Sequence, residues 1–565
     1  MTATTAPHLR STPTSKQLIV DGKPFFMRAA ELQNSSLSSA EYMMTKWQKL
    51  LDMNINTILG SVTWEMIEPV EGQFDFTEID QVITDARNFG MRLVLLWFGS
   101  FKNGQSSYVP SWVKLDTKRF PRVQLRKAGG VLETAEVLSL FDTEGAKADS
   151  KAFQTLMQHL KEVDGGNHTV IMVQVENETG VLGDSRDGSS AASQRFASPV
   201  PTDLLDFLVQ DWESLHSDLR RNLPDLTSFQ ELSKLGKSWE DVFGRSPKTD
   251  ELFMAYHLCQ YVDTVAAAGR KAYDLPLFTN VWMNYVDDDS DNAFPTVAGG
   301  GGNPGDYPSG GPVSNVLDVW QHFAPHLDFI APDVYLTDYQ RSCAKYRHRG
   351  QPLFIPEQRR SEYGARRIWT AIANYQALGV SPFGIDTLEP EMCPFTRHYG
   401  LLKQVNKIVL DAQTRPGSSV GFYFDELDES QPSKPVQVQK AGFNITIDRC
   451  FVFGKPGPGA GMLIHLGGEG KTARFLLVGW GFHAAFKSAN AKSHFTGILN
   501  FKEKRVVDEG TGELKTVRTL GGDETRSGIF AMMPNEDPDY GGFPICVTIP
   551  AATAIAEVEV YSLEE

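Results

Sequence analysis

Eight short apolar segments recur over about the first 400 residues of this chain, and stretches with helical periodicity separate most of them. Runs of this length that are rich in β-branched and aromatic residues predict strands buried on both faces, as in a parallel sheet. Strands that alternate with helices predict βα units, and eight of them predict a closed (β/α)8 TIM barrel of the α/β class. The eight segments are residues 25–31, 57–62, 92–98, 169–175, 276–282, 327–334, 352–357 and 383–387.

The two ends of the chain have a different texture. Residues 1–16 are polar and rich in Thr, Ser and Pro, which predicts a disordered tail. After residue 413 helical periodicity fades, and short alternating runs separated by Gly-rich turns predict an all-β sandwich or jelly roll. Because 565 residues exceed one ordinary domain, we expect a barrel over 17–413 and a C-terminal β domain over 414–565.

Composition excludes several classes of partner. The formal net charge of −16 disfavours nucleic acid and anionic membrane surfaces, and it is compatible with a neutral ligand such as a sugar. The five cysteines are odd in number and none are closely spaced, so they predict neither a zinc site nor a disulfide framework. We expect no metal and no cofactor, and a homo-oligomer is compatible with the sequence.

The sequence also bears on the compartment. The N-terminal stretch lacks the apolar central region of a secretory signal, and no apolar run is long enough to span a membrane. We therefore expect a cytoplasmic protein, although a secreted mature form that has lost its leader would look the same.

Carboxylates stand where two of the predicted strands end. Glu176, Asn177 and Glu178 follow the fourth apolar run, and Glu357 follows the seventh. The C-terminal ends of barrel strands meet at one face, which carries the active site in enzymes of this fold. Cleavage of a glycosidic bond needs two carboxyl groups, of which one protonates the leaving oxygen and the other attacks or activates water. The Glu178 and Glu357 pair therefore predicts a glycosidase.

Two motifs carry a resemblance to a known group of enzymes. Residues 64–69 and 72–76, WEMIEP and GQFDF, resemble the W…EP…G.(F/Y)DF segment of glycoside hydrolase families 35 and 42. Residues 174–180, QVENETG, resemble the Gln-x-Glu-Asn-Glu-(Phe/Tyr)-Gly motif of the same families. The chain is most similar to a family 35 branch that joins the barrel to a C-terminal β domain. This resemblance implies a retaining exo-β-galactosidase with Glu178 as acid/base and Glu357 as nucleophile.

The sequence departs from the resemblance at three places. Many members have Cys-Ala-Glu-Trp after the third strand, where this chain has Phe98 to Asn103. Thr179 replaces an aromatic residue, and Pro356 and Gln358 flank Glu357 where many members have Thr and Phe. A β-glucosidase or β-xylosidase of the same clan therefore stays open, as does a non-catalytic carbohydrate-binding barrel. A metal- or Schiff-base-dependent lyase is disfavoured, because the eight segments show no strand-end Lys and no His-x-x-x-His pair stands out among the twelve His.

Further side chains at strand ends are candidates for binding the sugar. The resemblance makes Asn177 the firmest, because the residue before the acid/base contacts the 2-hydroxyl in this clan. The predicted substrate-binding residues are Glu31, Trp64, Asn103, Asn177 and Tyr335.

Other residues offer alternatives to these roles. Glu362 and Glu389 are alternative nucleophiles, and Asp333 and Asp386 are expected to hold hydroxyls or to pair with Arg359. Glu176 is expected on the same strand face as Glu178, since side chains two apart share a face. The glycine run at 299–302 is compatible with a phosphate-binding loop, but no Lys-Ser/Thr follows it, so we favour a flexible loop over the site.

Overall fold

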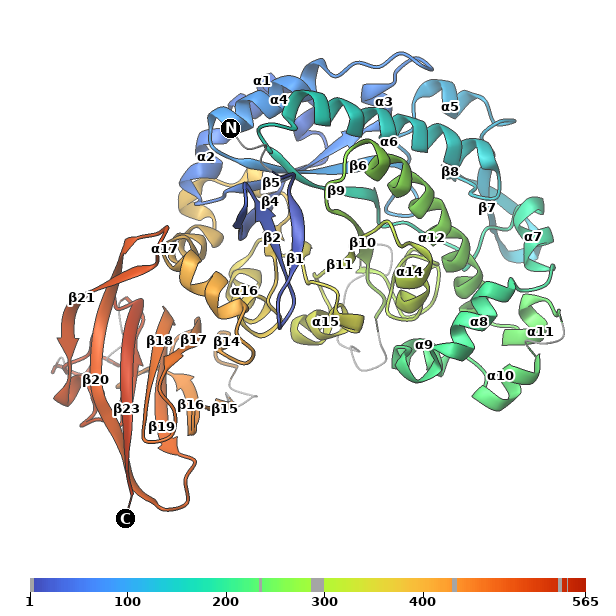
Figure 1. Ribbon diagram of the computed structural model, residues 1–565. Helices are drawn as coiled ribbons and strands as arrows, with labels where there is room; N and C mark the ends of the chain where they lie inside the picture. Colours follow the sequence, from blue (N-terminus) through green and yellow to red (C-terminus); the bar gives the residue numbers. More distant parts are fainter. Residues whose placement is uncertain are drawn as a thin grey trace.

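A computed structural model describes residues 5–232, 236–285, 299–428, 434–536, 541–545 and 547–564 (Figure 1). Its largest sheet has eight strands, and all the strand pairs within it are parallel. The strands in sheet order are β11 (Phe329–Asp333), β10 (Leu277–Trp282), β9 (Val170–Asn177), β6 (Arg92–Lys102), β5 (Thr57–Thr63), β4 (Met27–Glu31), β13 (Gly379–Pro382) and β12 (Ile355–Gln358).

The two outer strands of this sheet meet and close it. The backbone N–H of Val334, just after β11, donates to the carbonyl oxygen of Glu357 in β12 at 2.9 Å, and Val334 forms a parallel bridge with Gln358. The predicted barrel is therefore confirmed, and its closure brings the ends of β9 and β12 to one mouth.

Helices cover the outside of the barrel (Figure 1). Their apolar residues and the outward-facing strand residues form one large core, whereas a smaller cluster fills the barrel interior. The helices along the chain are α1 (Ala40–Met44), α2 (Trp47–Asp52), α3 (Trp64–Ile67), α4 (Thr77–Asn88), α5 (Ser111–Leu115), α6 (Thr143–Asp164), α12 (Pro247–Ala272), α14 (Leu317–Phe323), α15 (Tyr339–Lys345), α16 (Glu362–Asn374) and α17 (Phe395–Gln413).

Two long excursions leave the mouth of the barrel. The segment after β6 contains the hairpin of β7 (Arg122–Arg126) and β8 (Leu132–Leu138). The segment after β9 contains short helices that precede α12: α7 (Ser190–Phe196), α8 (Thr202–Gln210), α9 (Ser217–Arg221), α10 (Leu226–Leu232) and α11 (Trp239–Phe243). These insertions account for the length of the barrel domain.

The predicted eighth strand was wrong in its position. The strand is β13, Gly379–Pro382, and residues 385–387 form a short 3-10 helix beyond its end. Gly379 fits a close approach that a side chain would block, because an added Cβ would lie 2.5 Å from the carbonyl oxygen of Met27 on the neighbouring strand. Sequence periodicity placed the strand on the more apolar-looking segment instead.

The segment expected to be a disordered tail contains ordered structure. β1 (His8–Ser11) pairs antiparallel with β2 (Lys16–Val20), which in turn pairs with β3 (Lys23–Pro24). Leu18 and Val20 of β2 pack in the same apolar cluster as the side chains of the barrel interior, which include Met27. The hairpin thus covers one end of the barrel (Figure 1), and burial of its apolar side chains explains why it is ordered.

The C-terminal region is an all-β domain, as predicted, and begins after α17 ends at Gln413. A six-stranded sheet has the order β14 (Ser419–Phe424), β17 (Gly459–Gly467), β18 (Thr472–Trp480), β23 (Ile555–Glu564), β20 (Ser493–Asp508) and β21 (Glu513–Leu520). A four-stranded sheet has the order β15 (Val436–Lys440), β16 (Phe443–Arg449), β19 (Phe482–Ser488) and β22 (Phe530–Met533).

Alternation along β17 and β18 divides the apolar side chains between two cores. Met462 and Val478 belong to the core that includes the barrel helices, whereas Leu463 and Leu477 belong to the core of the β domain. Period-two alternation of this kind places successive side chains on opposite faces of a sheet. The six-stranded sheet therefore packs on the barrel domain with one face and on the rest of its own domain with the other.

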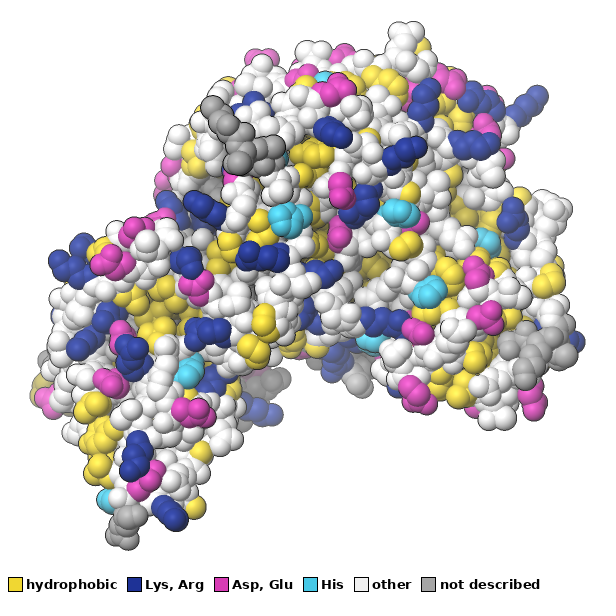
Figure 2. All heavy atoms as spheres, viewed as in Figure 1, with side chains coloured by type: hydrophobic (Ala, Val, Ile, Leu, Met, Phe, Trp, Pro, Cys, Tyr) yellow, Lys and Arg dark blue, Asp and Glu magenta, His cyan; other side chains and the backbone are white. Residues whose placement is uncertain are grey.

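Charged side chains of both signs lie on the surface. Acidic and basic side chains are interspersed over the face drawn in Figure 2. Among the described helices, we find none that combines the length and the apolar character needed to span a bilayer.

Candidate active site

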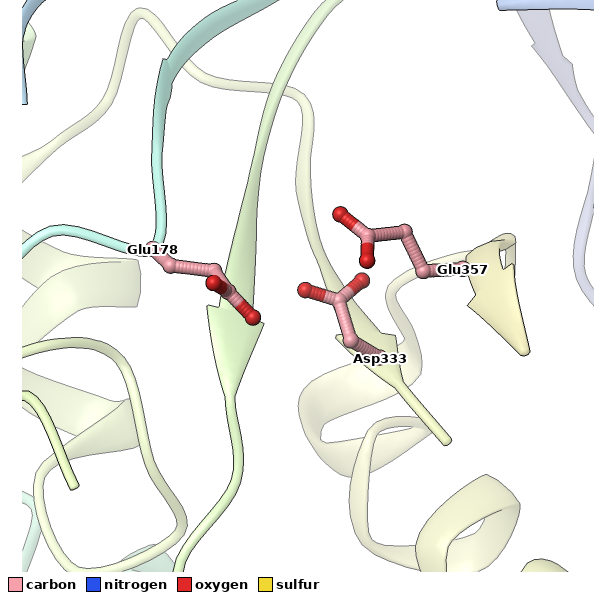
Figure 3. A group of neighbouring side chains, drawn as sticks. All are labelled: Glu178, Asp333 and Glu357. Atoms are coloured by element: carbon pink, nitrogen blue, oxygen red, sulfur yellow. The ribbon is translucent and has the colours of Figure 1, made fainter. Parts of the chain in front are cut away.

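A cavity of about 230 Å³ opens at the C-terminal ends of the barrel strands. Three carboxyl groups, those of Glu178, Asp333 and Glu357, point toward one another in its floor and wall (Figure 3). One oxygen from each of these groups lies within 4.8 Å of the others. The complete lining is Asn103, Glu178, Trp282, Met283, Tyr285, Gly299, Asp333, Tyr335, Leu336, Thr337 and Glu357.

Glu178 is held at the point where the chain leaves β9. Glu176 and Glu178 both have left-handed backbone angles, with φ of 61° and 44°, so the extended strand stops here. The backbone N–H of Glu178 donates to Oδ1 of Asn280 at 2.9 Å. Burial, and then the charge of Glu357, raise the pKa of the Glu178 carboxyl from 4.5 to about 7. A carboxyl group with this pKa can carry a proton at neutral pH, which a general acid must do.

Glu357 is fixed by two donors. The Tyr335 hydroxyl donates to Oε2 at 2.9 Å, and Nδ2 of Asn280 donates to Oε1 at 3.3 Å. Only 7% of this residue is exposed, so its orientation is set by these contacts. One hydrogen bond to each oxygen aims the carboxyl group at the cavity that Glu178 also lines.

Asp333 is the third carboxyl group of the cavity. Nδ2 of Asn280 donates to its Oδ2 at 2.8 Å, so one amide bridges Asp333 and Glu357. Burial, and then the charges of Glu357 and Glu178, raise the pKa of Asp333 well above its usual value. Three such oxygens also form the kind of ligand set that hard cations take. A ligating carboxylate must be ionised, and the raised pKa of Asp333 works against its ionisation.

Lys102 corrects one expectation from the sequence. β6 runs four residues beyond Phe98, where the sequence predicted its end, so the barrel does have a Lys at a strand end. Lys102 is only 5% exposed and its Nζ donates to Oδ1 of Asn177 at 2.9 Å. Burial lowers the pKa of Lys102, but the charges of Glu357 and Glu178 outweigh it and the net pKa is raised.

The predicted substrate-binding residues divide into three groups. Asn103 and Tyr335 line the cavity. Glu31 and Asn177 are buried next to it, and Glu31 lies close enough to Glu357 and Lys102 for their charges to act on its pKa, which burial raises first. Trp64 was predicted wrongly. Its indole is fully buried, donates to Glu68 at 2.7 Å and packs edge-on against Trp112.

Glu176 does not share the face of Glu178, contrary to the alternation argument. Its carboxylate accepts from the backbone N–H groups of Ser100 and Phe101 at 3.3 and 2.8 Å and lies beside Asp149 of α6. The left-handed φ at Glu176 breaks the period of two that a regular strand imposes. Glu176 therefore supports the end of β6 from the helix side instead of lining the mouth.

The alternative carboxylates lie outside the cavity. Glu362 begins α16 and its carboxylate is 58% exposed, within 3.9 Å of Arg366. Glu389 forms a surface ion pair with Lys49 at 2.5 Å. Asp386 accepts from the Gln33 backbone and the Ser36 hydroxyl, at 3.1 and 2.7 Å.

Asp386 therefore does not pair with Arg359, whose Nε donates to the carbonyl oxygen of Tyr335. The glycine run meets the site at Gly299, and residues 286–298 of the same loop lie outside the described residues. Gly300 packs against the indole of Trp282, since an added Cβ would lie 2.7 Å from its Nε1.

Sequence reasoning missed several residues of the site. Asn280 and Trp282 lie two apart at the end of β10, and this spacing puts both side chains on one face of the strand. A polar Asn in an apolar strand was a usable signal for Asn280. Nothing local marked Lys102, because its strand was expected to end earlier.

Two parts of the chain match known families. Residues 37–244 match the model of glycoside hydrolase family 42, described as beta-galactosidase. Residues 395–532 match a domain of unknown function, DUF5597. The first match includes the motif around Glu178 and ends before Glu357. It concerns one of the two families that the motifs resemble, and assignment to family 35 stays a prediction.

Individual proteins also show similarity. A beta-galactosidase from Xanthomonas manihotis is 28% identical over 173 residues, which is 30% of this chain and 26% of that protein. This chain therefore matches about a quarter of the length of that relative.

Solved structures align over most of the chain at low identity. The catalytic domain of beta-amylase from Paenibacillus polymyxa gives a TM-score of 0.43 at 12% identity, over 65% of this chain and 95% of its own. The beta-galactosidase from Marinomonas ef1 gives 0.44 at 13% identity, over 69% and 62%.

Proposed function

We propose that this protein is a glycoside hydrolase that removes terminal β-galactosyl residues by a retaining double displacement. The observation that carries the proposal is the buried pair of Glu178 and Glu357, which face one cavity from the ends of β9 and β12 in a closed barrel. The family match described as beta-galactosidase, which includes Glu178, supports the substrate class.

The geometry favours retention over inversion. Oxygens of Glu178 and Glu357 lie within 4.8 Å of each other. Retaining glycosidases keep their carboxyl groups about 5–5.5 Å apart, whereas inverting ones need about 6.5–9.5 Å to admit a water molecule. The closer spacing suits direct attack by Glu357 on the anomeric carbon.

The protonation states suit the same mechanism. Glu178, with its pKa raised to about 7, would protonate the leaving oxygen. Once Glu357 is esterified by the sugar its charge is gone, so the pKa of Glu178 falls and the carboxylate can act as base toward water. The Tyr335 hydroxyl, which donates to Glu357, would give up that hydrogen bond as the covalent bond forms and would then donate to the sugar ring.

The cavity volume favours exo action on a single sugar unit. At about 230 Å³ it is smaller than the roughly 300–1,000 Å³ of pockets for drug-sized ligands. Trp282 and Tyr285 in its wall offer flat apolar faces of the kind that pack on sugar rings. Small carbohydrates are therefore the proposed substrates, and β-glucosides and β-xylosides are the alternatives to test.

The Lys at the end of β6 does not favour a Schiff-base lyase. A lysine acts as a nucleophile only when it is deprotonated, which usually requires a lowered pKa. The net effect on Lys102 is a raised pKa, because four carboxylates outweigh its burial.

Three measurements test the proposal together. The full chain is assayed on nitrophenyl β-galactoside, β-glucoside and β-xyloside, with and without chelator, and the galactoside should be cleaved fastest in both conditions. Early NMR spectra should show the β-anomer of the released sugar. A 2-deoxy-2-fluoro galactoside should label Glu357. An α-anomer as first product, or a label on Glu362 or Glu389, would contradict the assigned mechanism.

A further inference from the structure

An irregularity in strand pairing places Lys102 at the site. Trp97 of β6 pairs with Val175 of β9, and the next pair is Lys102 with Asn177. Four residues of β6 therefore lie opposite one residue of β9, Glu176. Bulges of this kind re-aim side chains next to active sites. After the bulge, β6 pairs with β9 again, and Lys102 then lies beside Asn177.

A buried carboxyl pair clamps the bulge from behind. Glu176 accepts the N–H groups of Ser100 and Phe101, and Asp149 accepts the Ser100 hydroxyl at 2.6 Å and the Trp97 indole at 2.9 Å. Gly99 has no room for a side chain, because an added Cβ would lie 2.5 Å from Oε1 of Glu176 and from Nε1 of Trp97. The position of Lys102 is thus set by packing and hydrogen bonds on the far side of the strand.

The contact of Lys102 with Asn177 fixes which way the amide faces. An ammonium group has only donors, so Asn177 must present Oδ1 to it, at 2.9 Å. Nδ2 then faces elsewhere, and no described residue accepts a hydrogen bond from it although it is buried. A buried donor without an acceptor is unfavourable, so an acceptor from a ligand would be stabilising. Asn177 directly precedes Glu178, which lines the cavity.

The charge of Lys102 acts on the carboxyl groups around it. The charges of four carboxyl groups, those of Glu357, Glu178, Glu31 and Asp333, act on its ammonium and raise its pKa against the effect of burial. Of these carboxyl groups, Glu357 also accepts the hydrogen bond of the Tyr335 hydroxyl. On Glu178, burial and Glu357 raise the pKa, and Lys102 is the charge that opposes them.

We propose that Lys102 is a positioning residue of this site: it turns the amide of Asn177 so that Nδ2 meets the 2-hydroxyl of the sugar, and it supplies the positive charge that balances the carboxyl groups of the cavity. The inference rests on the proposed glycosidase function. Lys102 acts through Asn177 and through its field, without contacting the anomeric centre.

The kinetic test compares Lys102→Met, Lys102→Arg and Asn177→Ala in the full chain. The substrates are nitrophenyl β-galactoside and its 2-deoxy analogue. Lys102→Met and Asn177→Ala should each lose about 10- to 100-fold in kcat/KM on the galactoside and only a few-fold on the 2-deoxy compound. We define discrimination as the ratio of kcat/KM on the galactoside to kcat/KM on the 2-deoxy compound. In the double variant Lys102→Met/Asn177→Ala this ratio should be no lower than in Asn177→Ala alone.

A pH profile of kcat/KM separates the effect of the Lys102 charge from the effect of its shape. Lys102→Met should move the basic limb of kcat/KM to higher pH, because the charge that lowers the pKa of Glu178 is gone, whereas Lys102→Arg should keep the limb near its wild-type position. Lys114→Met is the matched control, since Lys114 pairs with Glu65 on the surface and lies outside the cavity lining. It should change neither the limb nor the discrimination.

Calorimetric binding of 1-deoxygalactonojirimycin, and of the same compound without the hydroxyl equivalent to the 2-hydroxyl, makes the two levels of the proposal distinguishable. Wild-type protein that neither cleaves the glycosides nor binds the inhibitor overturns the proposed function and this inference with it. Active wild-type protein whose 2-hydroxyl discrimination and basic limb are both unchanged in Lys102→Met overturns the role of Lys102 alone.

Discussion

Replacing Glu178 by Gln should make the protein less active and, above neutral pH, more stable. The pKa of Glu178 is raised from 4.5 to about 7 in the folded state. At pH 7 about half of the molecules then carry the proton, against roughly 0.3% for a carboxyl group of ordinary pKa. The environment thus increases the acid-competent fraction roughly 150-fold, at the expense of folding stability.

The sign of the stability effect follows from the two pKa values. Below pH 4.5 the carboxyl group is protonated in the folded and unfolded states, and its ionisation does not affect stability. Between pH 4.5 and about 7 only the unfolded state ionises freely, so stability falls as pH rises. Above pH 7 the full difference applies, and at about 1.36 kcal/mol per pH unit it amounts to about 3 kcal/mol.

Gln has the shape of Glu without the ionisation, so Glu178→Gln should remove this penalty. We expect urea unfolding midpoints equal to wild type near pH 4 and higher than wild type at pH 8, by up to about 3 kcal/mol in free energy. Glu389→Gln, at an exposed ion pair, serves as the control and should change stability by less than about 1 kcal/mol at either pH.

Activity supplies the second half of the test. Loss of the general acid should reduce kcat by about 10²–10⁴-fold on substrates with poor leaving groups. Substrates with very good leaving groups should still form the glycosyl intermediate, and azide should restore its turnover. Equal losses on all substrates without azide rescue would refute the acid/base role. A stability difference that is the same at pH 4 and pH 8 would refute the electrostatic reasoning.

Three further changes test other parts of the structure. Tyr335→Phe removes the 2.9 Å hydrogen bond to Glu357 and should slow formation of the covalent intermediate by about 5- to 10-fold in pre-steady-state bursts, with an unchanged burst disproving the contact's importance. Gly99→Ala would put a Cβ 2.5 Å from Oε1 of Glu176 and should lower the free energy of unfolding by about 1–3 kcal/mol, as measured by thermal unfolding. A wild-type Tm would contradict the close packing. Gly421→Ala would put a Cβ 2.0 Å from a carbonyl oxygen of α16 and should loosen the β domain, seen as faster proteolysis near residue 419, whereas an unaltered digest would count against that contact.

The sequence by itself determined the architecture and the position of Glu178 and Glu357 at one end of the barrel. Apolar runs of strand length that alternate with helical patterns leave few arrangements other than a parallel barrel, and alternation in the last part of the chain specifies a β domain. Glu178 and Glu357 were predicted because strand ends in such a barrel meet at one face. The family match that includes the Glu178 motif agrees with the resemblance read from residues 174–180.

Only the tertiary structure decided how the side chains around these glutamates are used. Trp64 sits in a motif, yet packing against Trp112 and a hydrogen bond to Glu68 place it in the core. Local pattern could not locate Lys102, because its position depends on a bulge held by Asp149, a residue of a helix that comes later in the chain.

Local sequence patterns also could not predict the pKa values and the backbone conformation of the site. The pKa of Glu178 depends on burial and on Glu357, 179 positions away in the sequence, and on the opposing charge of Lys102. The left-handed turn at Glu176 overrides the alternation that sequence spacing assumes. Periodicity records which face of an element is apolar, whereas bulges, bridges across the barrel and buried charges arise from contacts between elements, and these exist only once the chain has folded.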